Sequence, residues 1–484
     1  FAPALLAGDY QITISRDGFK RVSLGPLKVD VSTTLAQDVT LEPGSVAESV
    51  TVAAETSQVE TTSGRLATTI EVKQVLEMPL VDRNVFALVN LVPGAFFNRD
   101  TGAISLGGGR VGETSATLDG AFDSRGGLGS NGTEVAPPVD AVQEFKVEVN
   151  NMSAEFGRST GGSLNVVTKS GTNRFSGTVY EFVRNQKFDA AGWNADSKPP
   201  LRRNNFGGSF GGPLRKNRTF FFYNNEALID RRPTAATRNV GLPEWRTGNF
   251  STATRDAGGR AQMVVIYDPN TGTGNFTRPL ATTPFPGNIV PTSRLDPVAV
   301  KALGYVPKAN RTPDNPFNLA GNWRENLSDR INTDLHTARI DHQIGTRTNI
   351  FGRVTFHSPN QTASGTSAGY GPADPNLTVV ETLARHVVLS ATHVFSPTLF
   401  LTASAGAMRT KVVRESAGCC DTNYGQLFGL PNLPGGQSFP RFDIQGGLVP
   451  MTEIGASNIA YRVAAFTNFD HKADITKVWG AVTL

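Results

Sequence analysis

Residues 139–172, VDAVQEFKVEVNNMSAEFGRSTGGSLNVVTKSGT, combine two strand patterns with a glycine-rich connection. Between residues 140 and 149 apolar and polar residues alternate, which is the period of a half-buried β-strand. The pair Gly161-Gly162 then precedes a second short apolar run at residues 164–167. This stretch therefore predicts two β-strands joined by a glycine-containing connection. The apolar positions of the first strand are Val142, Phe145, Val147 and Val149.

The composition favours many strands joined by polar loops. The 484 residues include 50 glycines, and the 29 phenylalanines far outnumber the 8 tyrosines and 4 tryptophans, while only 39% of the residues are hydrophobic. A chain of this length has room for roughly two to four domains. The formal net charge of +4 is too even a balance to argue for nucleic acid or for anionic lipid as a partner.

The ends of the chain carry no recognisable targeting segment. No apolar run reaches the length of about 18 residues that predicts a transmembrane helix, and no signal-peptide pattern is present. The first residue is Phe1 rather than methionine, so we expect a fragment of a longer chain.

After residue 172 the pattern becomes that of strands with one apolar and one polar face, which is typical of a membrane β-barrel. Arg353 and Thr355 share the polar face of one predicted strand. In an earlier strand we expect Tyr180 and Phe182 to face lipid and Glu181 to face inward. Long connections are predicted at residues 230–329, 359–380 and 413–460, and short turns near Pro213, Gly345 and Pro397.

Several motifs in combination resemble TonB-dependent outer-membrane receptors of the Oar-like branch. Residues 75–94, VLEMPLVDRNVFALVNLVPG, are similar to the start of the plug domain of these receptors, and Leu118-Asp119-Gly120 resembles a turn of the plug. Residues 139–169 resemble the segment that closes the plug. The opening GDYQITISRDGFKRV is similar to the end of a carboxypeptidase regulatory-like β-sandwich. In residues 82–91 we expect a helix that Asp82 caps and whose apolar stripe packs in the plug core.

The resemblance implies a mainly β architecture. Its parts are a truncated β-sandwich module, an α+β plug domain, and the N-terminal part of an antiparallel transmembrane β-barrel, which has about 22 strands when complete. About seven to nine barrel strands are recognisable in the sequence, and the chain stops at Leu484 without the terminal aromatic strand on which the family usually ends. The resemblance therefore implies that the C-terminal part of the barrel is missing. The implied parts are residues 1–45 for the sandwich, 46–60 for a linker with a candidate TonB box, 61–171 for the plug, and 172–484 for the barrel with its long extracellular loops.

The same resemblance implies active uptake across the outer membrane of a Gram-negative bacterium, without enzymatic activity. The implied partners are outer-membrane lipid, an extracellular ligand (a glycan, a siderophore or a peptide) and the periplasmic domain of TonB, to whose sheet a β-branched linker strand can add. No catalytic residue, cofactor, metal or nucleic acid is expected. The candidate residues are Glu48, Ser49, Val50, Thr51, Val52 and Ala53 for the TonB box; Arg110, Asp119, Asp123 and Arg125 for ligand contacts of the plug loops; and Lys146, Glu148 and Arg158 for contacts between plug and barrel.

Purely structural roles also fit several of these candidate residues. Residues 48–53 also suit a plain linker strand, and Lys146, Glu148 and Arg158 also suit solvated or core-paired charges. The adjacent Cys419 and Cys420 fit a loop pair better than a redox pair, because a disulfide between neighbours is strained.

Other motifs that look catalytic fit structural roles better. GLGSNG at residues 127–132 matches a dinucleotide fingerprint, but Pro137-Pro138 prevents the helix that must follow it. The G-x-S-x-G matches at residues 207–211 and 365–369 lack the strand–turn–helix context of a nucleophile elbow. In residues 334–342, DLHTARIDH, two histidines and Asp334 share a strand face, which favours a polar rim over a metal site.

Two further functions remain to be distinguished from uptake. A barrel-anchored surface protein for adhesion or export, without TonB coupling, suits the long loops rich in Asn, Thr and Gly. A secreted enzyme with a regulatory β-sandwich would need no membrane. Binding to the periplasmic domain of TonB separates a receptor from the surface protein, and membrane fractionation tests the secreted enzyme.

Overall fold

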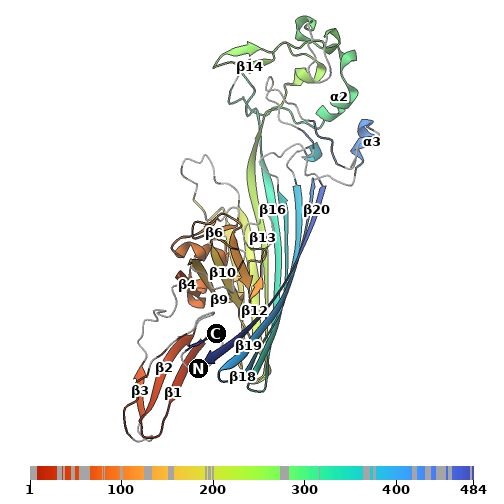
Figure 1. The fold of residues 1–484 in the computed structure, drawn as a ribbon. Helices are drawn as coiled ribbons and strands as arrows, with labels where there is room; N and C mark the ends of the chain where they lie inside the picture. The colour runs from red at the N-terminus through yellow and green to blue at the C-terminus, as the bar shows by residue number, and fades with distance from the viewer. Residues whose placement is uncertain are drawn as a thin grey trace.

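The computed structural model describes residues 8–29, 35, 37, 39–44, 49–53, 66–78, 80, 82–98, 102–124, 133–150, 157, 159–190, 193, 198, 201–272, 283–315, 317–363, 371–373, 378–416, 422–430, 438–442, 454–455, 461–479 and 482–483. They form a small N-terminal sheet, a five-stranded domain, a large antiparallel sheet and a module of loops and short helices (Figure 1). No helix in this part of the chain is both long enough and apolar enough to cross a membrane.

The N-terminal sheet has three strands: β1 (Gly8–Ile14), β2 (Arg21–Val29) and β3 (Ser49–Ala53). β1 and β2 form an antiparallel hairpin, and Gly18 takes the positive φ of +83° that its turn requires. Val22, Leu24 and Leu27 of β2 are buried in a small apolar cluster. The candidate TonB box contributes β3, which pairs in parallel with β2.

The predicted plug is a five-stranded sheet with short helices and one small hairpin. Its strand order is β4-β9-β10-β7-β8, with β9 and β10 antiparallel and β10 and β7 parallel. The strands are β4 (Leu66–Glu71), β7 (Thr114–Leu118), β8 (Ala121–Phe122), β9 (Val142–Asn150) and β10 (Gly162–Thr168), with the hairpin β5 (Ala95–Asn98) and β6 (Ala103–Leu106) beside them. The helices are α1 (Val72–Glu77) and the 3-10 helices η1 (Val85–Leu91) and η2 (Val139–Ala141).

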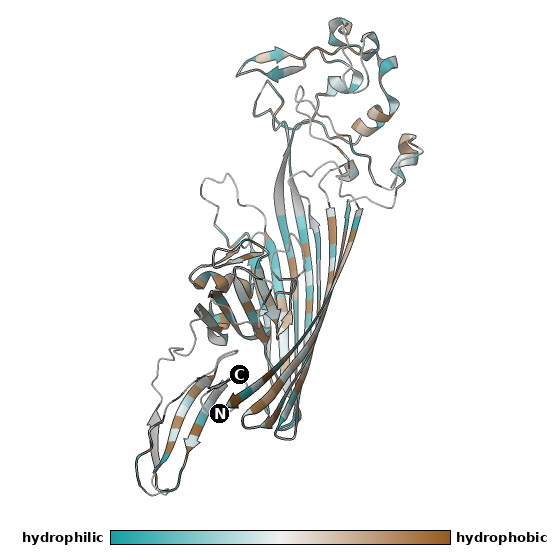
Figure 2. Ribbon diagram, in the orientation of Figure 1, coloured by the Kyte–Doolittle hydropathy of each residue, from teal (hydrophilic) through white to brown (hydrophobic). Residues whose placement is uncertain are grey.

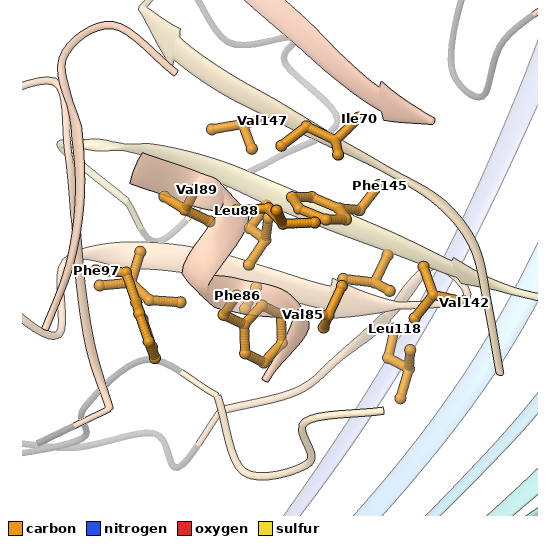
Figure 3. Packing of buried hydrophobic residues seen from close by; sticks show 14 of the residues in the cluster. Ile70, Val85, Phe86, Leu88, Val89, Phe97, Leu118, Val142, Phe145 and Val147 are labelled. Carbon is orange, nitrogen blue, oxygen red and sulfur yellow. The ribbon is translucent and has the colours of Figure 1, made fainter. Parts of the chain in front are cut away.

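The plug core lies between η1 and the sheet (Figure 3). Phe86 and Leu88 of η1 pack in one cluster with Phe145 of β9 and Leu118 of β7, and each of these side chains is buried. Complete burial of side chains of this size contributes about 1.5–3 kcal/mol each. The predicted apolar stripe of residues 82–91 is therefore confirmed as core.

The predicted cap of that helix is wrong. Asn84, not Asp82, is the N-cap residue, and its side chain accepts a hydrogen bond from the backbone N–H of Phe86. The Asp82 carboxylate forms an ion pair with Arg203 of the large sheet instead. An ion pair with a distant arginine has replaced a local capping bond, which sequence spacing cannot reveal.

The predicted barrel wall is a nine-stranded antiparallel sheet among the described residues, and the plug lies against one of its faces (Figure 1). Tight turns join β12 to β13, β16 to β17 and β18 to β19 at one end, and long connections lie at the other. The strands are β11 (Ser176–Asn185), β12 (Arg202–Arg215), β13 (Thr219–Arg238), β16 (Trp323–Ile344), β17 (Thr348–Ala363), β18 (Thr378–Ser396), β19 (Leu399–Ser416), β20 (Tyr461–Trp479) and β21 (Val482–Thr483).

Hydrophobic and hydrophilic residues alternate along these strands (Figure 2). In β17 the side chains of Arg353 and Thr355 are buried toward the plug and Phe356 is exposed, as the pattern predicts. In β11 the predicted faces are reversed, because Tyr180 donates a hydrogen bond to Glu226 on the plug side, while Glu181 is exposed. Alternation assigns residues to two faces, but it does not say which face meets lipid.

The long connections carry a module of their own. Its apolar clusters gather around Trp245 in one part and around Tyr424, Phe428 and Phe439 in another. The strands enter the predicted loops, since β13 extends to Arg238. The elements of the module are η3 (Pro243–Thr247), β14 (Thr254–Asp256), β15 (Ala261–Met263), η4 (Pro269–Thr271), η5 (Pro286–Asn288), η6 (Thr292–Arg294), α2 (Pro297–Leu303), η8 (Gly371–Ala373) and α3 (Tyr424–Phe428).

Candidate functional site

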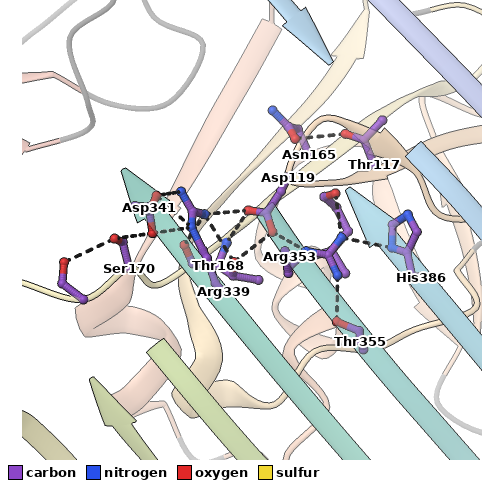
Figure 4. A network of polar contacts seen from close by, with 12 residues as sticks. Thr117, Asp119, Asn165, Thr168, Ser170, Arg339, Asp341, Arg353, Thr355 and His386 are labelled. Carbon is purple, nitrogen blue, oxygen red and sulfur yellow. Dashed lines mark hydrogen bonds and ion pairs between the residues drawn. The ribbon is translucent and has the colours of Figure 1, made fainter. Parts of the chain in front are cut away.

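Charged side chains join the plug to the wall at three places, and the most buried of them centres on Asp119 (Figure 4). Asp119 and Gly120 form the two-residue turn between β7 and β8, with φ of +54° and +84°. Positive φ at both positions makes a type I′ turn, for which Asp-Gly is a favoured pair. The sequence of this turn therefore fixes the direction in which the carboxylate leaves the plug.

The Asp119 carboxylate receives hydrogen bonds from both sides of the interface. Within the plug, the backbone N–H and the hydroxyl of Thr168 each donate to it over 2.8 Å. From the wall, Arg353 Nε lies 2.6 Å and Arg339 Nη1 lies 3.2 Å from its oxygens. Burial alone would raise the pKa of Asp119, but the two guanidinium groups and the Thr168 bonds outweigh it and hold this pKa below its ordinary value.

Arg353 is fully buried and is held by several groups. Its guanidinium donates to the Leu118 carbonyl over 3.1 Å, to the Thr355 hydroxyl over 2.7 Å and to His386 Nδ1 over 3.0 Å. Each of these partners is neutral in this arrangement, because a histidine nitrogen that accepts a hydrogen bond carries no proton. Asp119 therefore supplies the closest negative charge to Arg353.

Arg339 has a second carboxylate of its own. Asp341, two residues along β16, lies 2.8 Å from Arg339 Nη2 and also accepts a hydrogen bond from the Ser170 hydroxyl. Arg339 Nη1 donates to the Thr168 carbonyl over 3.1 Å. The segment that leaves the plug after β10 is thus bonded to the wall that it enters.

A second contact centres on Arg83, a residue with a positive φ of +51°. Its guanidinium lies 2.5 Å from Asp140 within the plug and 3.9 Å from Glu226 on β13. It also lies over the rings of Tyr180 and Phe182, at 4.6 and 4.1 Å from their centroids. A planar guanidinium can stack on rings and pair with carboxylates at once, which an ammonium group does less well.

The third contact joins Asp82 of the plug to Arg203 of β12. Arg203 also lies 3.4 Å from Asp230, and Arg232 lies 2.7 Å from the same carboxylate. The Asp230 side chain is fully buried. In all three places the plug and the wall therefore meet through a charge pair that water barely reaches.

Two of the three predicted plug–barrel residues lie on the plug strand β9. Lys146 and Glu148 are buried on β9, with Nζ and Oε1 3.7 Å apart. Arg158 lies outside the described residues, so its role stays a prediction. The arginines that meet the plug, Arg203, Arg339 and Arg353, were not singled out as contacts by sequence reasoning. An arginine on the polar face of a barrel strand was the available signal.

The predicted ligand residues of the plug loops occupy different environments. Arg110 is exposed, whereas Asp119 and Asp123 are buried. Burial raises the pKa of Asp123 well above its ordinary value, and the nearby Arg353 and the Val135 N–H bond only partly offset this. Arg125 lies outside the described residues. Ligand contact by these side chains stays a prediction.

The remaining sequence candidates can be placed briefly. The candidate TonB strand pairs with β2 from Ser49 opposite Arg21 to Ala53 opposite Gly25, while Glu48 lies outside the described residues. His336 and His342 share hydrogen bonds with Tyr223 and Thr219 of β13. Cys419 and Cys420 lie outside the described residues. No cluster of three or more His, Cys, Asp or Glu that could hold a metal occurs in the described part of the chain.

The loop module contains an apolar cavity of about 380 Å³. Trp245, Phe250 and Leu303 line it, and Arg246 lies at its wall. The Arg246 guanidinium donates to the carbonyls of Leu303, Val306 and Pro307 over 2.7–2.8 Å, so it ties the segment around η3 to the end of α2. The volume falls within the range of small-molecule pockets.

Comparison with known proteins agrees with this architecture. Residues 167–484 match the outer membrane beta barrel domain family. The TonB-dependent transporter Oar from Myxococcus xanthus is 25% identical over 236 residues, which are 46% of this chain and 22% of that protein. The outer membrane transporter YddB from Escherichia coli superposes with a TM-score of 0.50 at 9% identity, covering 86% of this chain and 46% of that one. The siderophore receptor PirA from Acinetobacter baumannii gives a TM-score of 0.45 at 12% identity, covering 85% and 45%.

The chain therefore spans about half the length of these solved structures and a smaller share of Oar. The predicted resemblance to Oar-like TonB-dependent receptors, the mainly β fold and the location in the outer membrane are confirmed. The carboxypeptidase regulatory-like module and carbohydrate binding stay predictions.

Proposed function

This chain belongs to the outer membrane beta barrel domain family, and from that premise we propose that it acts in a TonB-dependent receptor for active uptake of a large or scarce ligand. The relatives it matches are named as transporters and receptors rather than enzymes. In this proposal the plug closes the barrel, ligand binds on the side of the loop module, and force from TonB opens the plug. The ligand class is a glycan, a siderophore or a peptide.

The observation that carries the proposal is the pair of buried salt bridges between Asp119 of the plug and two arginines of the wall. A domain that merely filled the barrel would need apolar packing alone. Here Arg339 and Arg353 reach a buried carboxylate of a plug turn from two neighbouring wall strands. Buried charge pairs hold one geometry well and are costly to break, which suits a plug that must stay shut until work is done on it.

The coupling strand of the proposal is residues 48–53. Five of these residues form β3, which is an edge strand of the N-terminal sheet. An edge strand presents unpaired backbone groups to which another strand can add. The linker from β3 leads to β4, the first strand of the plug. Pairing of TonB with this strand would therefore transmit force directly to the plug.

The test is the binding of the periplasmic domain of TonB to the full-length protein in detergent. Deletion of residues 48–53 should abolish this binding, and deletion of residues 55–60 should preserve it, because the second deletion shortens the same linker by the same length without touching the candidate strand. Equal binding by both deletion variants would refute the assignment of the coupling strand.

A second candidate function is a barrel-anchored surface protein for adhesion or export without TonB coupling. The observation that favours it is the size of the loop module, whose side chains form apolar clusters of their own. This function predicts that wild-type protein does not bind the periplasmic domain of TonB at all, so the same experiment separates the two.

A further inference from the structure

Three arginines stand side by side on the outer face of the wall, and we propose that they bind the phosphate groups of an anionic lipid in the outer leaflet. They are Arg202 on β12, Arg231 on β13 and Arg330 on β16, which we call the arginine ladder. In the strand register Arg202 is opposite Arg231, and Arg231 is opposite Arg330. The proposal needs only the barrel and does not depend on TonB coupling.

The ladder faces away from the plug. Directly opposite residues on neighbouring strands point to the same side of a sheet, and the next residues along each strand point to the other side. Arg203 and Asp230, the neighbours of Arg202 and Arg231, lie on the inner side, where Arg203 meets Asp82 of the plug. The ladder therefore lies on the outer side, and its members are exposed or half-exposed.

The two faces treat their arginines differently. On the inner side Arg203 has carboxylate partners. On the outer side, none of the three ladder residues forms a salt bridge with a carboxylate of the described residues. Arg231 Nη1 bonds only to neutral oxygens, such as the Asn332 side chain at 2.9 Å. Like charges directly opposite one another destabilise a sheet, so an anion between them would offset this repulsion.

An apolar surface lies next to the ladder, on the side of the tight turns. On β13, Ile229 is the outward-facing residue before Arg231, and on β12 Phe206 and Phe210 follow Arg202 at outward positions, each at least 38% exposed. A molecule with acyl chains and phosphates fits such a surface, because its chains cover the apolar residues while its phosphates meet the guanidinium groups. Free phosphate would match only the ladder.

A second set of cations repeats this arrangement further round the wall. Arg385 on β18 is opposite Arg409 on β19, and Lys411 is the next outward residue of β19. All three are exposed, and Val387 and Leu389 continue the outer face of β18 as apolar residues. Outward carboxylates do occur, at Glu181, Asp334, Glu381 and Glu415, but none of them is opposite an arginine of either set.

The position of both sets relative to the connections identifies the leaflet. The ladder lies toward the ends of the strands that carry the long connections, and the tight turns lie at the opposite ends. In outer-membrane barrels the longer connections are extracellular. The cations therefore lie at the level of the outer-leaflet headgroups.

The test counts lipid bound to the full-length protein in detergent by native mass spectrometry, with bis-phosphorylated lipid A as the probe. The triple variant R202Q/R231Q/R330Q should bind at least tenfold more weakly, because a cation near an anionic lipid surface contributes roughly fivefold in affinity. The matched control R215Q/K216Q/R218Q removes three exposed cations from the turn between the same two strands, β12 and β13, and should bind within about twofold of wild type.

Two arms use wild-type protein alone and decide the matter even if the triple variant does not fold. Lipid A without its two phosphates should bind at least tenfold more weakly, and millimolar inorganic pyrophosphate should not displace the intact lipid. Undiminished binding by the dephosphorylated lipid would overturn the proposal in favour of apolar contact. Displacement by pyrophosphate would overturn it in favour of a site for free phosphate, and equal binding by the triple variant would exclude the ladder.

Discussion

Substitution of Asp119 by asparagine tests how much the salt bridges with Arg339 and Arg353 hold the plug against the wall. Asparagine keeps the size of the side chain and an oxygen that can accept from Thr168, but it removes the charge that faces Arg339 and Arg353. The loss of this charge affects Arg339 and Arg353 to different extents. Arg339 retains Asp341 at 2.8 Å, whereas the remaining close partners of Arg353 are a carbonyl, a hydroxyl and a neutral imidazole.

This difference sets the free-energy cost that we expect for the D119N substitution. Loss of one partner of a buried ion pair costs about 3–5 kcal/mol. Since one of the two arginines keeps a carboxylate, we expect the lower end of this range, about 3 kcal/mol, which is roughly a hundredfold change in the plug's opening equilibrium. The Asp119 and Arg353 side chains are 1% and 0% exposed, so solvent does little to reduce this cost.

The measurement is hydrogen exchange of the β7 and β10 amides in the full-length protein, because local opening of the plug exposes them. Exchange in D119N should be roughly a hundredfold faster than in wild type. The matched control E113Q changes a half-exposed carboxylate of the same domain whose hydrogen bonds, among the described residues, lie within the plug, and it should leave exchange within about twofold. A rise of less than about fivefold in D119N would refute the reasoning.

An acid titration provides an independent check on the same carboxylate. Because the pKa of Asp119 is lower in the folded plug than in the unfolded chain, its stabilisation is complete above the unfolded value of about 3.9 and is lost as the pH falls through the folded value. The opening equilibrium of the wild-type plug, taken as the exchange rate divided by the intrinsic rate at each pH, should therefore rise below about pH 4. D119N should lack this component of the pH dependence.

Three further predictions concern the same domain. Asp123→Asn should stabilise the plug at pH 7 or leave its stability unchanged, because burial raises the pKa of the Asp123 carboxyl group. A raised pKa means that the folded plug gains stability as the pH falls from that value toward about 3.9. Faster exchange of the β7 amides in this variant would contradict this prediction. Arg83→Ala should destabilise the plug by about 3 kcal/mol in urea unfolding, because it removes the partner of Asp140 and the contacts with Glu226, Tyr180 and Phe182. R83K should recover only part of this loss, and full recovery would mean that the rings of Tyr180 and Phe182 do not contribute. Gly162→Ala should cost about 1–3 kcal/mol in the same urea assay, since its Cβ would lie 2.5 Å from the Glu148 carbonyl and 2.8 Å from Leu106 Cβ, and an unchanged midpoint would show that the sheet can shift to admit it.

The local sequence pattern predicted the strands of this fold well. The contacts between strands that are distant in sequence could not be predicted from it. The strand period placed Arg353 and Thr355 on one face, because alternation is a property of each strand alone. The same period led to the wrong faces for β11, because the apolar rings of Tyr180 and Phe182 suit lipid equally well. Their side is decided by distant partners, Arg83 of the plug and Glu226 of β13.

The interface charges were beyond sequence reasoning for a related reason. Asp119 was singled out for its turn, but Arg339 and Arg353 follow it by more than 200 residues. Strand order and register determine which wall strand lies beside the Asp119-Gly120 turn, and neither can be read from a single sequence. Likewise the overall charge of +4 gave no argument for an anionic lipid, whereas the register brings three arginines together on one outer face.

The position of the charge contacts within the plug sheet bears on how the proposed force would act. The linker enters the plug at β4, an edge strand that pairs only with β9 among the described strands. Asp119 lies in the turn between β7 and β8, at the opposite edge of the sheet. Force applied at Leu66 therefore loads the six paired residues of β4 before it reaches the contacts with Arg339 and Arg353. A plug built this way can open along β4 while its far edge stays bound to the wall, and that bound edge would guide it back when the force ends.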